Sequence, residues 1–169
     1  IKDKPEFDEE FEDVFKHESP DRKKEIQKRY GTMRAYLENM DRLRKIAGNL
    51  VNHYIDEVLP NGYKAMVVAS SVLAAARYEF LILEAIKLRL EEEKNKAERD
   101  EELIEQLEFI DASTVVTMQD NNEEAVISAV RKKAKERKAV DNFKKDFDLE
   151  KDDDGQYKHP NTGIAFLCV

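Results

Sequence analysis

A short apolar run, Tyr63-Lys64-Ala65-Met66-Val67-Val68-Ala69-Ser70-Ser71, constrains the fold of this chain more than any other stretch. It is rich in small and β-branched residues, follows Pro60-Asn61-Gly62 and ends at two serines, which is typical of a strand buried on both faces. A helical pattern begins directly afterwards, at Val72. A buried strand that leads into an amphipathic helix indicates half of a βαβ unit, and open parallel sheets bind ligands at the carboxyl ends of their strands. We therefore expect any functional site near Ser70 and Ser71.

Two long stretches show helical periodicity. Between Thr32 and Val58, apolar residues recur every three or four positions, which predicts an amphipathic helix that ends at Pro60. A second pattern of this kind extends from Val72 to Glu93. An earlier helix start is indicated at Ser19-Pro20-Asp21, where a capping serine precedes a proline and an acidic residue. We expect residues 20–60 to form a helical linker that precedes the strand.

The N-terminal arm has a composition of its own. Residues 1–20 carry a net charge of −5, and Phe7, Phe11 and Phe15 are spaced four residues apart. This spacing places the three rings on one face of a short helix. We expect residues 1–19 to form an acidic arm or docking helix that packs on the rest of a larger protein.

The segment 91–112 interrupts the alternation of helix and strand. It is strongly acidic and has almost no apolar residues before Leu103. This composition predicts an acidic insertion, which is either an exposed helical extension or a mobile segment. The apolar residues from Leu103 onwards indicate one or two helical turns at its end.

Two further strand candidates complete the pattern. β-branched residues predict a strand over 113–118, and the following helix is capped by Asn121 or Asn122. The turn at 160–163 leads into a third candidate strand, residues 164–169.

The order of these elements predicts an α/β fold with a short parallel sheet, preceded by long helices. Strands separated by helices pair in parallel through right-handed crossovers, so residues 65–70, 114–118 and 164–168 should form one sheet. An antiparallel or all-helical structure would contradict this expectation. The chain starts without a methionine and stops inside the third strand candidate, so we expect a fragment of a larger protein.

The charge is unevenly distributed. The net charge of −8 argues against a uniformly basic nucleic-acid binder, but two basic stretches, Arg22–Lys45 and Arg131–Lys138, stand between acidic ones. In the first stretch, the basic residues on the outer face of the long helix either touch a phosphate backbone or form a solvated face; they are Arg34, Arg42, Arg44 and Lys45.

Apolar runs and cysteine usage bear on the cellular setting. No apolar run approaches about 18 residues, so we expect no membrane span and no membrane partner. The single cysteine, Cys168, excludes an intramolecular disulfide and favours a reducing, cytoplasmic location. Its place in an apolar run predicts an inert, buried thiol rather than a nucleophile.

Motifs for catalysis are absent from the sequence. It has no Gly-x-x-x-x-Gly-Lys phosphate loop, no Gly-x-Gly-x-x-Gly, no His-Glu-x-x-His and no Gly-x-Ser-x-Gly. The run Asp152-Asp153-Asp154-Gly155 resembles the start of a calcium loop but lacks the closing glutamate, which predicts a solvated turn. We expect the chain by itself to contain no catalytic residue, bind no metal and hold no cofactor.

One stretch resembles a known family. The residues from Gly62 to Ser71, followed by Ala74-Ala75-Ala76-Arg77-Tyr78, are similar to helicase motif IV in the R (restriction and translocation) subunit of type I restriction enzymes. Residues 161–169 resemble the strand that leads into motif V of the same family. The likeness covers roughly residues 20–169 and is most specific at the first motif.

The resemblance implies a superfamily 2 helicase with two RecA-like domains of the P-loop NTPase type. Such a subunit uses ATP and magnesium to translocate duplex DNA, cleaves it endonucleolytically, and works with methyltransferase and specificity subunits. By this analogy residues 61–169 form the N-terminal part of the second RecA-like domain, with the acidic insertion at 91–112. The nuclease carboxylates and the ATP-binding residues would lie elsewhere in the parent subunit.

The resemblance also assigns a nucleic-acid track to the carboxyl ends of the strands. Hydroxyls, amides and helix N-termini at this edge hold phosphates without reading bases. The candidate DNA-binding residues are Ser70, Ser71, Asp120, Asn121 and Asn122. Capping of the following helix is an equally good explanation for the two serines, and the two roles do not exclude each other.

Two other functional interpretations stay open. The chain could be a helical protein-interaction module with no role in DNA or ATP binding, whose Phe7, Phe11 and Phe15 face packs on another chain. It could also belong to a different superfamily 2 helicase that has no nuclease.

Overall fold

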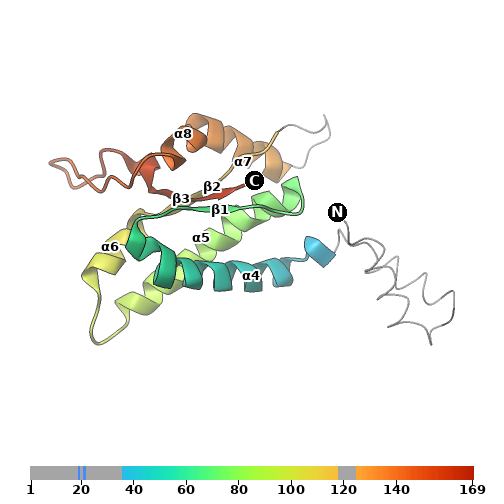
Figure 1. Cartoon of the computed structure of the whole chain (residues 1–169), viewed down its shortest axis with the longest axis horizontal. Coiled ribbons are helices and arrows are strands. Elements are labelled where there is room, and N and C mark those ends of the chain that lie inside the picture. Colours follow the sequence, from blue (N-terminus) through green and yellow to red (C-terminus); the bar gives the residue numbers. More distant parts are fainter. Residues whose placement is uncertain (1–18, 20, 22–35, 118–124) are drawn as a thin grey trace.

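The computed structural model describes Ser19, Asp21 and residues 36–117 and 125–169. In this part of the chain a three-stranded parallel sheet lies between two layers of helices (Figure 1). The strands are β1 (Ala65–Val67), β2 (Asp111–Thr114) and β3 (Ile164–Cys168), in the spatial order β1-β3-β2. The expected α/β class and the parallel pairing of the three strand regions are confirmed.

Five α-helices pack around the sheet in the described part of the chain. One face is covered by α4 (Met40–His53) and α5 (Val72–Lys94), with α6 (Glu101–Phe109) packed beside α5. The other side carries α7 (Ala125–Glu136) and the short α8 (Ala139–Phe143), as Figure 1 shows. A π-helical turn (Tyr54–Val58) and two 3-10 turns (Leu59–Asn61 and Pro160–Gly163) lead into β1 and β3.

The central strand is β3, and the strand at residues 65–67 lies at an edge. All five residues of β3 are buried, whereas Met66 and Val68 are 59% and 79% exposed. The expectation that the run from Tyr63 to Ser71 is buried on both faces is therefore wrong. The reason is that α8 packs over β3 and α7 over β2, so the same face of β1 is left without a helix.

The second strand begins earlier than the β-branched run indicates. The sequence predicts residues 113–118, but β2 comprises Asp111–Thr114. Parallel register places the small residues Ala112 and Ser113 opposite Phe166 and Leu167 of β3. Small side chains fit beside this bulky central strand, and this tertiary requirement outweighs β propensity.

The predicted long helix is interrupted near its start. Asn39 adopts an extended conformation and its side-chain oxygen accepts a hydrogen bond from Arg42 N at 3.0 Å, so α4 begins only at Met40. At the other end the winding loosens into the π-helical turn, and Pro60 lies in a 3-10 turn that closes at Gly62 with φ 74°. A left-handed φ of this kind favours glycine, and the helical winding ends at Gly62, two residues after the stop predicted at Pro60, whereas the α-helix itself ends earlier, at His53.

The acidic segment 91–112 contributes to the core. Its helix α6 is capped by Asp100, whose carboxylate accepts a hydrogen bond from Leu103 N at 3.0 Å, and both Ile104 and Leu107 are buried. Glu93 is only 2% exposed and forms an ion pair with Lys96 at 2.5 Å. The helical turns expected from Leu103 are confirmed, but the segment is not an exposed extension as a whole.

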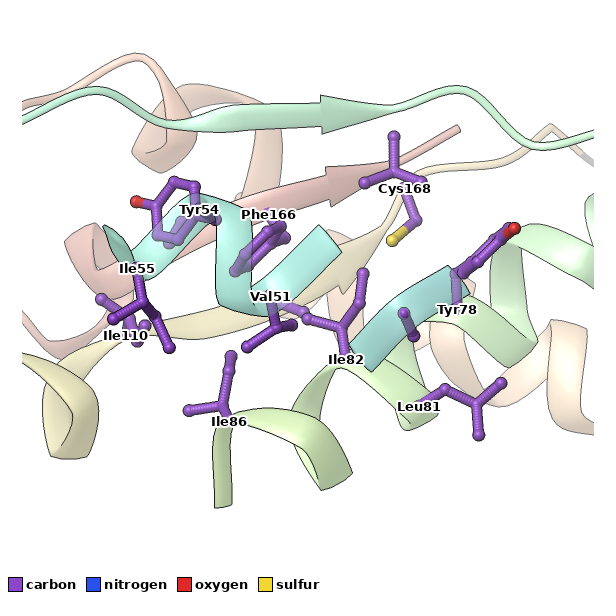
Figure 2. Packing of buried hydrophobic residues seen from close by; sticks show 14 of the residues in the cluster. Val51, Tyr54, Ile55, Tyr78, Leu81, Ile82, Ile86, Ile110, Phe166 and Cys168 are labelled. Carbon is purple, nitrogen blue, oxygen red and sulfur yellow. The ribbon is translucent and has the colours of Figure 1, made fainter. Parts of the chain in front are cut away.

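The main hydrophobic core lies between β3 and the helices α4 and α5. Phe166 is fully buried, with its ring centroid 4.4 Å from that of Tyr54 (Figure 2). Figure 2 also shows Cys168 directed from β3 into the same cluster as Val51 and Ile82. Because α4 supplies fully buried residues, the described part of the 20–60 linker shares its core with the sheet.

A lysine connects three segments at the amino end of the sheet. Lys64 Nζ donates hydrogen bonds to the backbone oxygens of Thr162, at 2.7 Å, and Asn142, at 3.2 Å, and lies 4.6 Å from the ring centroid of Phe147. Burial lowers the pKa of Lys64 to about 8, although the nearby Asp146 carboxylate acts in the opposite direction. Lys64 therefore holds the connection between α8 and β3 against the start of β1.

This lysine should give the protein a specific pH dependence. In the unfolded chain a lysine titrates near pH 10.4, so between about pH 8 and 10.4 the unfolded state binds more protons than the folded state. The free energy of unfolding of the wild type should therefore rise over this range, relative to Lys64→Met, by on the order of 1 kcal/mol. Urea denaturation of both proteins at pH 7.5 and pH 10 measures this difference. Lys45→Met, at an exposed position of α4, is the control and should follow the wild type.

Candidate nucleic-acid interface

The carboxyl edge of the sheet brings together the segments that follow each strand. Beyond β1 the pairing continues, with Val169 N donating to Val67 O at 3.0 Å and Ala69 N donating to Val169 O at 2.8 Å. Val115 N likewise donates to Cys168 O at 2.9 Å. The strands all point the same way, so the segments after β1, β2 and β3 lie at one edge, where parallel sheets bind ligands.

Ser71 is the N-cap of the long helix α5. Its hydroxyl oxygen accepts a hydrogen bond from Ala74 N at 3.1 Å, and its backbone is extended, with φ −159° and ψ 164°. Ser70, one residue earlier, is exposed at the same edge. The capping role expected for the serines is therefore confirmed for Ser71, whereas Ser70 presents its hydroxyl to solvent.

The hydroxyl of Ser71 is already hydrogen-bonded to a carboxylate. Ser71 Oγ donates a hydrogen bond to Glu38 Oε1 at 2.6 Å, and Arg77 Nη1 donates to the backbone oxygen of Glu38. These two contacts attach the segment before α4 to the start of α5. A negative carboxylate beside Ser71 disfavours a second anion at that hydroxyl, so Ser70 is the better placed of the two serines to contact a phosphate.

Three candidate residues lie outside the described part of the chain. Asp120, Asn121 and Asn122 belong to the connection between β2 and α7, and only residues up to Thr117 and from Ala125 onwards are described. The structure therefore brings Ser70 and Ser71 together at the predicted edge and leaves the other three as predictions.

Basic side chains gather near the same edge, on α7 and at the corner that follows it. A cavity of about 320 Å³ lies between the end of β2, α7 and the start of α8, and Arg131, Lys135 and Lys138 line it. Lys138 has a left-handed backbone, with φ 47°, at the corner between the two helices. The sequence shows that the stretch Arg131–Lys138 is basic, but it does not reveal the cavity that this stretch helps to line. The four-residue spacing of Arg131 and Lys135 is the signal that places these two on one face of α7, whereas Lys138 joins them only through the corner that follows the helix.

The remaining sequence candidates are structural. Burial raises the pKa of the Cys168 thiol to about 12, which agrees with an inert cysteine inside the core. The run Asp152–Gly155 forms an exposed turn in which Asp152 Oδ1 accepts hydrogen bonds from Asp154 N and Gln156 N. Within the described ranges no group of His, Cys, Asp or Glu side chains is arranged to hold a metal ion.

The character of the helices and the lack of similar proteins both bear on the interpretation of this site. Of the helices the structure describes, none has the length and apolar character to cross a membrane. Comparison of the chain with protein-family models, curated proteins and solved structures gave no match in any of the three. The functional assignment therefore depends on the sequence resemblance and on the geometry of the carboxyl edge.

Proposed function

We propose that this chain is part of the R subunit of a type I restriction-modification enzyme and contributes to the DNA track of its second RecA-like motor domain. The observation that carries the proposal is the position of the stretch that resembles motif IV. Its strand is part of a parallel sheet, and its two serines lie at the carboxyl edge, at the start of a long helix.

The chemistry of this edge suits contact with a phosphate backbone that is independent of base sequence. Ser70 is exposed, and positive charge is added by Arg131 and Lys135 on α7 and by Lys138 just after it. Hydroxyls and cationic side chains of this kind position a protein on DNA without reading bases, as a translocating motor requires.

In this proposal the parent protein supplies the remaining machinery. ATP and magnesium bind residues of the parent outside this chain, because the sequence contains no phosphate loop. Duplex DNA is the substrate of the motor, and the methyltransferase and specificity subunits are its protein partners. The cytoplasm is the compartment in which these partners meet.

DNA binding by the full chain tests the proposal. Fluorescence anisotropy with a labelled duplex should show weak binding, with a Kd of about 10⁻⁴ M or weaker at physiological salt, that weakens further as salt rises from 50 to 200 mM. Ser70→Ala should weaken binding about fivefold at 50 mM salt, because one hydrogen bond to a phosphate is lost. Ser70 is preferred to Ser71, whose replacement would also remove the helix cap and about 1 kcal/mol of stability.

A second exposed serine provides the matched control. Ser128→Ala, on α7, removes the same hydroxyl from a helix surface and should leave the affinity unchanged. Equal affinities of the two variants, or tight binding that does not respond to salt, would refute a phosphate contact at Ser70.

One observation favours a second function. The hydrogen bond from Ser71 to Glu38 places a carboxylate at the edge where a phosphate would bind, which suits an interaction module without a DNA role better than it suits a DNA track. Undetectable DNA binding at 50 mM salt would support that function.

A further inference from the structure

The cavity beside β2 combines an apolar floor with a basic rim. Its floor consists of small and β-branched residues: Val115, Val116, Ala134, Ala139 and Val140. Its rim carries the cations Arg131, Lys135 and Lys138, with Asp141 as the one acidic residue among the side chains that line it. A site of this kind favours an apolar, and especially aromatic, anchor that is flanked by carboxylates.

The chain itself contains a segment with this chemistry. Phe7, Phe11 and Phe15 recur every four residues, and acidic residues fill five of the six positions between them: Asp8, Glu9, Glu10, Glu12 and Asp13. With the net charge of −5 over residues 1–20, the segment offers aromatic anchors in a strongly negative setting. The negative charge of this segment is opposite to the positive charge of the rim, and its phenylalanine rings are apolar, as the floor is.

The point at which this segment joins the fold lies at the same edge of the sheet as the cavity. The contact between Glu38 and Ser71 fixes the start of α4 at the carboxyl edge of the sheet, and Val115 and Val116 of the cavity lie just beyond β2 at the same edge. Between Phe15 and Tyr36 there are twenty residues, which can span up to about 65 Å when extended. The linker is therefore long enough for the aromatic segment to reach the cavity within one molecule.

We propose that residues 5–16 dock into the cavity between β2, α7 and α8 of the same chain, with phenylalanine rings on its apolar floor and carboxylates against Arg131, Lys135 and Lys138. The docking does not require a DNA role, but it places carboxylates on the same three cations that the proposed DNA contact uses, so the arm and DNA would compete for them. It gives the acidic arm a place on the fold and covers an apolar surface that includes Val140, which is 38% exposed.

Photo-cross-linking in the full chain tests the docking. p-Benzoylphenylalanine in place of Phe11 retains an aromatic side chain and, on irradiation, bonds to C–H groups that lie against it. Mass spectrometry of the digested monomer should locate the cross-links at residues 114–116 and 131–141. Lys135→Glu should lower the yield of these cross-links about fivefold by replacing an attraction with a repulsion.

Lys132 supplies the matched control. It is on the same helix, its side chain is 78% exposed and it pairs with Glu136 at 3.9 Å, and it does not line the cavity. Lys132→Glu makes the same change of charge and should leave the yield unchanged. Equal losses in the two variants would show attraction to the helix in general and overturn the proposal.

The remaining outcomes also decide the question. Cross-links in covalent dimers would assign the cavity to the arm of a second copy, and cross-links confined to the exposed edge at Met66 and Val68 would assign the arm to another surface. A monomer without cross-links in the cavity would show that the arm does not dock there. Each of these results overturns the proposal.

Discussion

Replacing Phe166 with alanine should lower the free energy of unfolding by about 3–5 kcal/mol. Phe166 is fully buried in the central strand, and its ring lies against Tyr54 with a centroid distance of 4.4 Å. Its register neighbours on the flanking strands are Ala65 and Ala112, whose side chains are too short to fill the space that the ring leaves. The cavity should therefore persist, and the change should be near the upper end of this range. Urea denaturation followed by circular dichroism measures it.

An exposed residue of the same sheet serves as the control. Met66 is opposite Leu167 on β1 and is 59% exposed, so Met66→Ala should change stability by no more than about 0.5 kcal/mol. Small domains have a total stability of about 5–15 kcal/mol, so Phe166→Ala should remove a large part of it. A loss below about 1 kcal/mol for Phe166→Ala would contradict the position of β3 at the centre of the core.

The sequence predicts which segments form helices and strands better than it predicts how deeply each of them is buried. The strand after Gly62, the helix after Ser71 and the parallel pairing are all local or topological consequences of residue pattern. Which strand lies in the centre depends instead on the spatial order β1-β3-β2, which local pattern does not encode. For this reason the run from Tyr63 to Ser71 indicates a strand buried on both faces, although its strand lies at an edge of the sheet.

The candidate site is likewise only partly predictable from the sequence. The two serines were located at the carboxyl edge because strand direction and helix capping are readable from sequence. The hydrogen bond between Ser71 and Glu38 joins residues 33 positions apart across two helices, and no local pattern predicts it. The cavity beside α7 depends likewise on how β2, α7 and α8 pack, although the spacing of its three basic residues was visible.

Gly163 shows how a close backbone approach gives a large effect that sequence does not reveal. In the sequence it reads as an ordinary turn residue before the third strand, but a Cβ at this position would lie 2.2 Å from the backbone oxygen of Phe109. The end of α6 and the start of β3 therefore pack together only because residue 163 has no side chain. Gly163→Ala should lower the free energy of unfolding by about 3 kcal/mol, because backbone atoms must move to admit the methyl group.

A second glycine provides the control for this prediction, because its replacement by alanine should raise the free energy of unfolding instead of lowering it. Gly48 is inside α4, and a Cβ at this position would meet no atom within 4 Å. Alanine is the better helix former, so Gly48→Ala should raise the free energy of unfolding by about 1 kcal/mol. Urea denaturation of both variants measures the two changes. A neutral or stabilising effect of Gly163→Ala would show that α6 and the start of β3 are less tightly packed than in the structure. A loss of stability for Gly163→Ala together with a gain for Gly48→Ala would confirm that steric contact, and not the loss of glycine itself, determines the effect.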